Sequence, residues 1–177
     1  MRSRRPDEFA PECSNMELVI GVDDPRADDI RALLATHLAF SHAVTPAEYS
    51  FALDVEKLVE PEVTFFSARR AGVVVGVAAL KRLDQSHAEL KSMHTRETAR
   101  GRGVGRAMVE YLLTVAWHEG YRRVSLETGS TDEFVAARAL YAKAGFRTCG
   151  PFGDYGPSPY NTFMTISLEA RTVTPGA

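Results

Sequence analysis

Glycine occupies every second position of the stretch Arg100-Gly101-Arg102-Gly103-Val104-Gly105-Arg106. A segment rich in strand-forming residues ends just before it near Thr95, and a helical pattern of apolar residues begins near Gly103. Glycine lets a backbone approach a ligand closely with its N–H groups turned inward, and the N-terminus of a helix adds partial positive charge. The stretch therefore predicts an anion-binding loop at a strand-to-helix junction.

Two familiar phosphate-binding loops are excluded by the spacing. A dinucleotide fingerprint needs glycine at position 106, which is arginine here, and a Walker loop needs a Gly-Lys-Ser/Thr ending that the stretch lacks. For this segment taken alone, a glycine-rich turn without a ligand remains the alternative.

The charge distribution favours a ligand. Residues 81–106 hold seven basic and three acidic residues, a net +4, whereas residues 7–62 hold three basic and thirteen acidic residues, a net −10. A basic region around a glycine loop suits a polyphosphate cofactor, and an acidic region suits a cationic substrate. For the acidic half, a solvated helix face is the alternative interpretation.

Apolar periodicity on both sides of the loop predicts one mixed α/β domain. Strands are expected at residues 16–22, 63–70, 72–83, 88–95, 121–128, 146–149 and 162–168, with a tight turn at 70–72 and a loop at 150–159. Helices are expected after residues 23–25, after 45–46, over 103–120 and over 132–144. The third helix is expected to bury Val104, Met108, Tyr111, Leu112 and Val115.

The length of 177 residues fits one domain, expected over residues 16–169 between an N-terminal arm at 1–15 and a tail at 170–177. The abrupt start of the pattern makes Met16 an alternative start to Met1. With no apolar run of membrane-spanning length and no secretory signal, a cytoplasmic protein without a membrane partner is expected. The net charge of −2 argues against a nucleic-acid partner. Cys13 and Cys149 predict two reduced thiols and no metal site.

Two motifs carry a resemblance to a known family. The pattern Arg100-x-x-Gly103-x-Gly105 resembles the acetyl-CoA pyrophosphate loop of the GNAT superfamily of N-acetyltransferases. An Ala-x-x-x-Tyr-x-x-x-Gly-Phe pattern of the same superfamily is matched further along the chain by Ala137, Tyr141, Gly145 and Phe146. The sequence departs from the family at Phe134, where an asparagine is often found.

The resemblance implies a central, mostly antiparallel sheet that is splayed at the cofactor site and flanked by helices. It implies acetyl-CoA as co-substrate, no metal, and a small-molecule amine or a protein amine as acceptor. Since dimers are common among relatives, a homodimer is one expected assembly. The implied cofactor-binding residues are Met93, His94, Thr95, Arg100, Gly101, Arg102, Gly103, Val104, Gly105 and Arg106.

The same resemblance suggests catalytic residues. Glu89, on the strand before the loop, resembles the catalytic glutamate of protein-lysine members and is the expected general base; a plain pairing with Lys91 is the alternative. His87 and Glu127 are reserve bases. Tyr141 is expected to protonate the departing thiolate, with a purely structural core aromatic as its alternative.

Acceptor-binding residues are harder to assign. Glu127, at the end of a central strand, is expected to hold a cationic acceptor, and His37 is a further candidate although a core histidine is its alternative role. Asp154 and Tyr155 lie in a loop that is a weaker candidate for closing over the site. An N-acetyltransferase is thus the expected function, and a catalytically silent acyl-CoA-binding domain is the alternative.

Overall fold

The computed structural model describes residues 17–46, 51 and 54–168. The predicted arm, the predicted tail and the Met16 start lie outside the described residues, as does most of the segment in which a second helix was expected. The strands are β1 (Leu18–Val22), β2 (Val63–Arg70), β3 (Val73–Arg82), β4 (His87–Thr95), β5 (Arg123–Gly129), β6 (Arg147–Cys149) and β7 (Asn161–Ser167). The α-helices are α1 (Asp28–Val44), α2 (Val104–His118) and α3 (Val135–Lys143), with short 3-10 turns at Lys57–Val59, Glu97–Ala99 and Asp132–Phe134.

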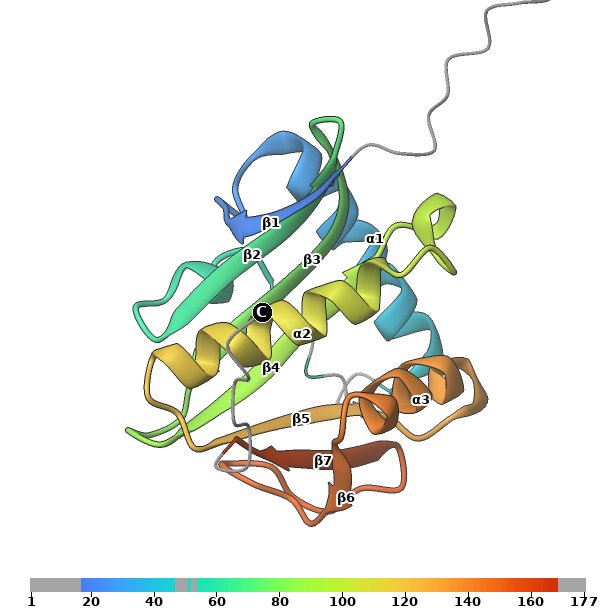
Figure 1. Ribbon diagram of the computed structural model, residues 1–177. Helices are drawn as coiled ribbons and strands as arrows, with labels where there is room; N and C mark the ends of the chain where they lie inside the picture. Colours follow the sequence, from blue (N-terminus) through green and yellow to red (C-terminus); the bar gives the residue numbers. More distant parts are fainter. Residues whose placement is uncertain (1–16, 47–50, 52–53, 169–177) are drawn as a thin grey trace, which may run out of the picture.

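The strands of the described part of the chain form one seven-stranded sheet in the order β1-β2-β3-β4-β5-β7-β6 (Figure 1). All neighbours are antiparallel except β4 and β5, which run parallel. These two strands pair only over His87–Leu90 and Arg123–Leu126, although β4 continues to Thr95 and β5 to Gly129. The sheet therefore opens between the C-terminal ends of β4 and β5, as predicted.

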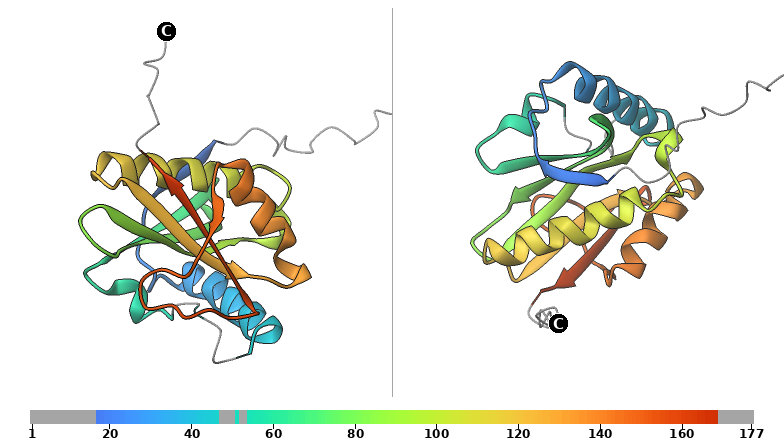
Figure 2. Two further views of the ribbon diagram at one scale, coloured as in Figure 1. Left: turned by 90° about the horizontal axis from the view of Figure 1, so that it is seen from below. Right: turned by 45° about the horizontal axis from the view of Figure 1, so that its top comes forward.

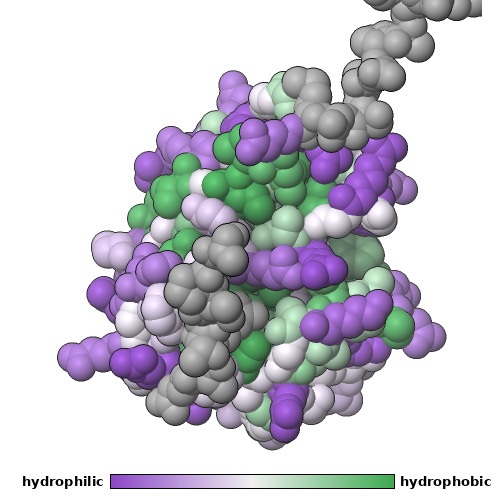
Figure 3. Space-filling view, viewed as in Figure 1, coloured by the Kyte–Doolittle hydropathy of each residue, from purple (hydrophilic) through white to green (hydrophobic). Residues whose placement is uncertain are grey.

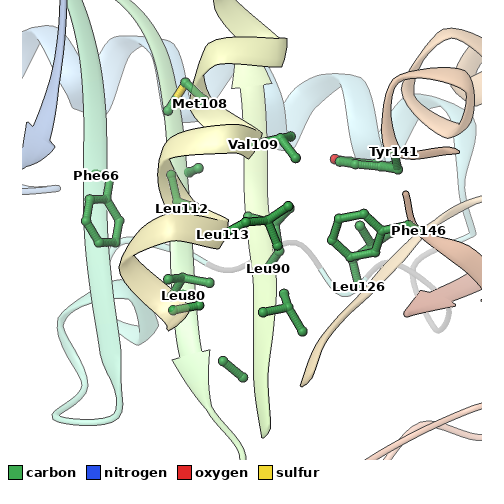
Figure 4. Packing of buried hydrophobic residues seen from close by; sticks show 14 of the residues in the cluster. Phe66, Leu80, Leu90, Met108, Val109, Leu112, Leu113, Leu126, Tyr141 and Phe146 are labelled. Carbon is green, nitrogen blue, oxygen red and sulfur yellow. The ribbon is translucent and has the colours of Figure 1, made fainter. Parts of the chain in front are cut away.

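The sheet is covered on both faces (Figure 2). Helix α1 packs on one face over β3 and β4, and α2 packs on the other face over the same strands, with α3 beside it. The larger core lies under α2 and includes Met108, Val109, Leu112 and Leu113 (Figure 4). A separate core under α1 is built around residues such as Ile30 and Leu34.

One predicted core position on α2 is wrong. Tyr111 was expected on the buried face but is 36% exposed, whereas Val109, Leu113 and Ala116 are buried. The apolar stripe is rotated because α2 lies against β3 at Gly76, where an added Cβ would come within 2.6 Å of the Met108 sulfur. The buried residues Val109, Leu112, Leu113 and Ala116 recur at i, i+3, i+4 and i+7, Met108 adjoins this stripe, and Tyr111 lies outside it.

Positive backbone φ angles explain two of the predicted turns. Ala71 and Gly72, with φ of 53° and 78°, join β2 to β3 in the two-residue form that suits a twisted hairpin. Gly120, with φ of 89°, lies just past the end of α2, where a left-handed residue commonly ends a helix.

The outer surface of the sheet edge is partly apolar. Val19 and Val22 on the edge strand β1 are 61% and 72% exposed, and Figure 3 shows hydrophobic residues gathered around β1 and β2 beside polar ones. In the ranges that the structure describes, none of the helices combines the length and the apolar character that crossing a membrane requires.

Candidate active site

A pocket of about 510 Å³, called the large pocket below, lies beside the C-terminal end of β4. Its walls come from the end of β4, the loop before α2 and the first turn of α2, the 3-10 turn before α3, α3 itself and two residues of α1. Every residue expected at the cofactor site lines this pocket except Arg102. The structure thus brings these residues together around one cavity; their contact with a cofactor stays a prediction.

The glycine-rich loop has a geometry that suits an anion. Gly101 and Gly103 have φ of 72° and 80°, a conformation that residues with a side chain rarely adopt. Gly103 occupies the N-cap position of α2 without a side-chain cap, so the first N–H groups of the helix face the pocket unblocked by such a cap. At Gly105 an added Cβ would lie 3.2 Å from the Leu140 side chain, which indicates close packing of the loop against α3.

The arginines of the loop are exposed and largely held by local contacts. Arg100 Nε donates to the Thr95 carbonyl oxygen at 3.3 Å, and Arg106 pairs with Glu110 at 2.8 Å on the surface of α2. Such exposed pairs contribute little stability, so both side chains are able to turn toward a phosphate. Burial, together with the charge of Arg100, lowers the pKa of His94 to about 4, which keeps this imidazole neutral.

A second, smaller pocket of about 90 Å³ adjoins the first, and it is called the small pocket below. The two share five lining residues: His37, Met93, Phe134, Ala137 and Tyr141. The small pocket is further lined by Glu127 from β5, by Lys91 and Ser92 from β4, and by Phe51. Two substrates bound in the two pockets would therefore meet beside these shared residues.

Glu127 gives the small pocket a half-buried carboxylate. Its Oε1 accepts a hydrogen bond from Asn161 Nδ2 at 2.5 Å, and within the described ranges no basic side chain forms an ion pair with it. Burial raises the pKa of Glu127, partly offset by the Asn161 hydrogen bond and by the charge of Lys91. Its position at the end of β5 is the one expected from the sequence.

Glu89 lies on β4 but does not line either pocket. Its Oε1 lies 2.9 Å from Lys91 Nζ, and the Tyr155 hydroxyl lies 2.5 Å from each of these two groups. Glu89 and Lys91 are both buried. The pairing of Glu89 with Lys91 that alternation along the strand allows is therefore present, and a role of Glu89 as general base stays a prediction.

His87 is held in one tautomer by its neighbours. The Arg123 guanidinium has no acceptor, so it donates to His87 Nδ1 at 3.1 Å, and His87 Nε2 carries the proton that it donates to Ser125 Oγ at 2.7 Å. Ser125 in turn lies 2.8 Å from Thr165 Oγ1. Burial and the Arg123 charge both lower the pKa of His87. Nδ1, the ring nitrogen that carries the lone pair, already accepts a hydrogen bond from Arg123. His87 is therefore a poor candidate for the general base.

Tyr141 lies where the two pockets meet. In Figure 4 its ring lies beside Phe146 and its hydroxyl points away from α3, and the two ring centroids are 5.9 Å apart. Burial raises the pKa of Tyr141 well above its usual value, and the nearby Glu127 carboxylate adds to the shift. The hydroxyl is therefore a hydrogen-bond donor at neutral pH. Tyr141 is a core residue and a pocket residue at once.

His37 enters the site from α1. Its ring centroid lies 5.1 Å from that of His94, and its Nδ1 is buried without a hydrogen-bond partner among the described residues. Burial, with a smaller contribution from His94, lowers the pKa of His37 to about 4. His37 thus lines both pockets, and its contact with an acceptor stays a prediction.

Sequence reasoning missed several residues that line the small pocket, among them Ser92, Lys91 and Phe134. Ser92 gave no signal, the sequence suggested Lys91 only as a partner for Glu89, and Phe134 stood out only as a departure from the family pattern. The sequence signal for the position of Phe134 is Gly129, because a Cβ at position 129 would collide with the Phe134 ring. Tyr155, a weak candidate by sequence, reaches the Glu89–Lys91 pair from the predicted loop. No three His, Cys, Asp or Glu side chains within the described ranges gather to hold a metal ion.

Comparison with known proteins agrees with this architecture. The uncharacterized N-acetyltransferases YsnE of Bacillus subtilis and YedL of Escherichia coli are each 41% identical over 149 residues, covering 84% of this chain and 99% and 94% of theirs. A solved structure from Klebsiella pneumoniae with the description acyl-CoA N-acyltransferase is 26% identical, with a TM-score of 0.74 over 87% of this chain and 99% of that one. A GNAT acetyltransferase from Elizabethkingia anophelis, solved with acetyl-CoA bound, shares the fold with a TM-score of 0.63 at 16% identity, over 85% of this chain and 98% of that one.

The family assignment rests on most of the domain. The model of the acetyltransferase (GNAT) family matches residues 28–146, which run from the start of α1 to the end of the second predicted motif. The matched range includes the glycine-rich loop and Tyr141. The chain belongs to the GNAT family and is an acetyltransferase.

Proposed function

We propose that the protein transfers an acetyl group from acetyl-CoA to a primary amine by direct transfer. The observation that carries this proposal is the junction of the two pockets: a large one beside the glycine-rich loop and a small one with the half-buried carboxylate of Glu127, joined at Tyr141. The large pocket fits a coenzyme with a pyrophosphate, because glycines with positive φ and the free N-terminus of α2 face it.

The charges in the small pocket favour a cationic acceptor. Lys91 forms an ion pair with Glu89, and His37 and His94 are neutral at pH 7 because their pKa values are lowered to about 4. Glu127 has no basic ion-pair partner among the described residues, so it is the acid left for a substrate ammonium group. A carboxylate that is largely removed from water is costly unless it has a partner of opposite charge, so an ammonium group is a suitable ligand.

Each residue then has a role in the reaction. Acetyl-CoA, when bound, supplies the thioester. Glu127 accepts a proton from the acceptor ammonium, directly or through a water molecule, and so frees the nitrogen lone pair to form the new N–C bond. Backbone N–H groups of residues 93–95 stabilise negative charge on the carbonyl oxygen. As the C–S bond breaks, the Tyr141 hydroxyl gives its proton to the sulfur and takes up the second proton that the nitrogen loses as the amide forms, so that the tyrosine ends protonated. Glu89 holds the Lys91 ammonium group in an ion pair and offsets its positive charge beside the small pocket.

The test is turnover with a panel of primary amines. Purified protein is mixed with acetyl-CoA and each amine, free thiol is measured over time, and the acetylated product is identified by mass spectrometry. We expect thiol release that depends on the amine and a product acetylated on nitrogen. Tight acetyl-CoA binding without turnover on any amine would instead identify a catalytically silent acyl-CoA-binding domain.

A further inference from the structure

The small pocket contains two polar atoms that the proposed chemistry does not use. Ser92 Oγ and His37 Nδ1 are buried, and neither has a hydrogen-bond partner among the described residues. Ser92 is 8% exposed, and both residues line the small pocket. Because buried polar groups almost always have a partner, these two atoms indicate a place where a polar group of a ligand binds.

The backbone directs Ser92 into the pocket. Between the pairs Val77–His94 and Ala79–Lys91, β3 advances by two residues and β4 by three, so β4 carries one extra residue. Ser92 lies within this bulge and has a φ of 52°, an uncommon value for a residue with a side chain.

The bulge has a visible consequence for the pocket. In a regular strand successive side chains point to opposite faces, yet Lys91, Ser92 and Met93 all line the small pocket. Strain of this kind persists where the surrounding structure imposes it, and it clusters at functional sites.

The charges decide which polar group fits there. The carboxylate of Glu127 accounts for one positive charge on the acceptor, and Lys91 is already paired with Glu89. A carboxylate on the acceptor would therefore place a second acidic group beside Glu127 with no basic side chain left to pair with it among the described residues. A hydroxyl group adds no charge, and it is able to donate to one of the two unpartnered atoms and accept from the other.

We propose that the acceptor is an amino alcohol, with its ammonium group against Glu127 and a hydroxyl group on a neighbouring carbon against Ser92 and His37. This inference rests on the proposed N-acetyltransferase function and narrows its substrate class. A pocket of about 90 Å³ holds only a few heavy atoms, so the two groups of the acceptor must be close together in its covalent structure. The hydroxyl is a positioning group, and the amine is the nucleophile.

The test uses acceptors that differ in the hydroxyl group alone. Ethanolamine is paired with propylamine, 1-amino-2-propanol with isobutylamine, and β-alanine represents acceptors with a carboxylate. For the wild type we expect kcat/KM to be at least about ten-fold higher for each amino alcohol than for its partner, because the analogue leaves buried polar atoms unpaired. β-Alanine should be the poorest acceptor.

Two variants assign the effect to Ser92. Ser92→Ala removes the hydroxyl, and Ser92→Gly removes it while also suiting the positive φ, so that the fold is kept. In both, the ratio of kcat/KM between each amino alcohol and its alkylamine should fall toward one, while Thr114→Ala, on the exposed side of α2, should keep the wild-type ratio.

The outcomes separate this inference from the proposed function. Equal kcat/KM within each pair, a preference for β-alanine, or an unchanged ratio in both Ser92 variants would overturn the amino-alcohol assignment while leaving amine acetylation intact. Absence of turnover with every amine would overturn the proposed function and this inference with it.

Discussion

The Lys91 ammonium nitrogen lies 2.9 Å from the Glu89 carboxylate, and both side chains are buried beside the small pocket. This pairing separates the two acidic residues of the site. Glu89 is neutralised within the protein, whereas Glu127, on the neighbouring strand, has the neutral amide of Asn161 as its hydrogen-bond donor. Because of this difference in partners, we assign the acceptor ammonium group to Glu127.

Breaking this pair should destabilise the fold. Lys91→Met leaves the Glu89 carboxylate buried without a cation, which costs about 3 kcal/mol in the free energy of unfolding. The double variant Lys91→Met/Glu89→Gln removes both charges and should recover most of that loss. Urea denaturation of Lys91→Met, Glu89→Gln, the double variant and the wild type measures the coupling energy between Lys91 and Glu89. Additive losses in the double variant would show that the pair contributes nothing.

Tyr141→Phe should lower kcat and leave the fold intact. The phenylalanine keeps the ring contact with Phe146 but removes the proton donor for the leaving thiolate. We expect kcat to fall about 100-fold, as is typical for the loss of a general acid, with an acetyl-CoA Kd close to that of the wild type. Thiol release and calorimetric titration measure the two quantities. Unchanged kcat would leave Tyr141 as a core residue only.

Gly103→Asp should weaken coenzyme binding through charge. Gly103→Asn is the matched control, because asparagine has the same size and tolerates the positive φ of this position about equally well. The aspartate places a negative charge at the N-terminus of α2, where the pyrophosphate is proposed to bind. We expect a Kd for CoA at least about ten-fold higher for Gly103→Asp than for Gly103→Asn. Equal affinities would place the phosphates elsewhere.

His37 should make the protein sensitive to acid. Its pKa is about 4 in the folded state against 6.5 for an ordinary histidine, so the unfolded chain takes up the proton first as the pH falls. Titration of His37 therefore leaves the stability of the protein unchanged above pH 6.5 and reduces it between pH 6.5 and 4. His37→Gln has no titrating group at this position, so the Tm of the variant relative to that of the wild type should rise as the pH is lowered through this range. A Tm difference independent of pH would contradict the assignment.

The parts of the fold that follow from local sequence were predictable. The glycines at 101, 103 and 105 fix the loop because their conformational freedom is a local property, and the spacing from Ala137 to Phe146 places Tyr141 on a helix that ends at a glycine. The splayed sheet was predicted only through the family resemblance, because the pairing between β4 and β5 joins segments more than thirty residues apart.

The parts that depend on distant contacts were not predictable. The direction of Ser92 follows from a bulge that exists only when β4 pairs with β3. Tyr155 reaches Glu89 across 66 residues of sequence. Tyr111 was placed in the core by helical periodicity, but the face that α2 buries is set by its close approach to Gly76. In each case the deciding neighbour comes from another element.

The assignment of the base is tested most directly by comparing Glu127→Gln with Glu89→Gln in steady-state kinetics, with one amine varied at saturating acetyl-CoA. We expect Glu127→Gln to lower kcat/KM for the amine at least about 100-fold while the Kd for acetyl-CoA is kept, and Glu89→Gln to have a much smaller effect. Wild-type activity in Glu127→Gln together with a large loss in Glu89→Gln would contradict the role of Glu127 and assign the base to Glu89.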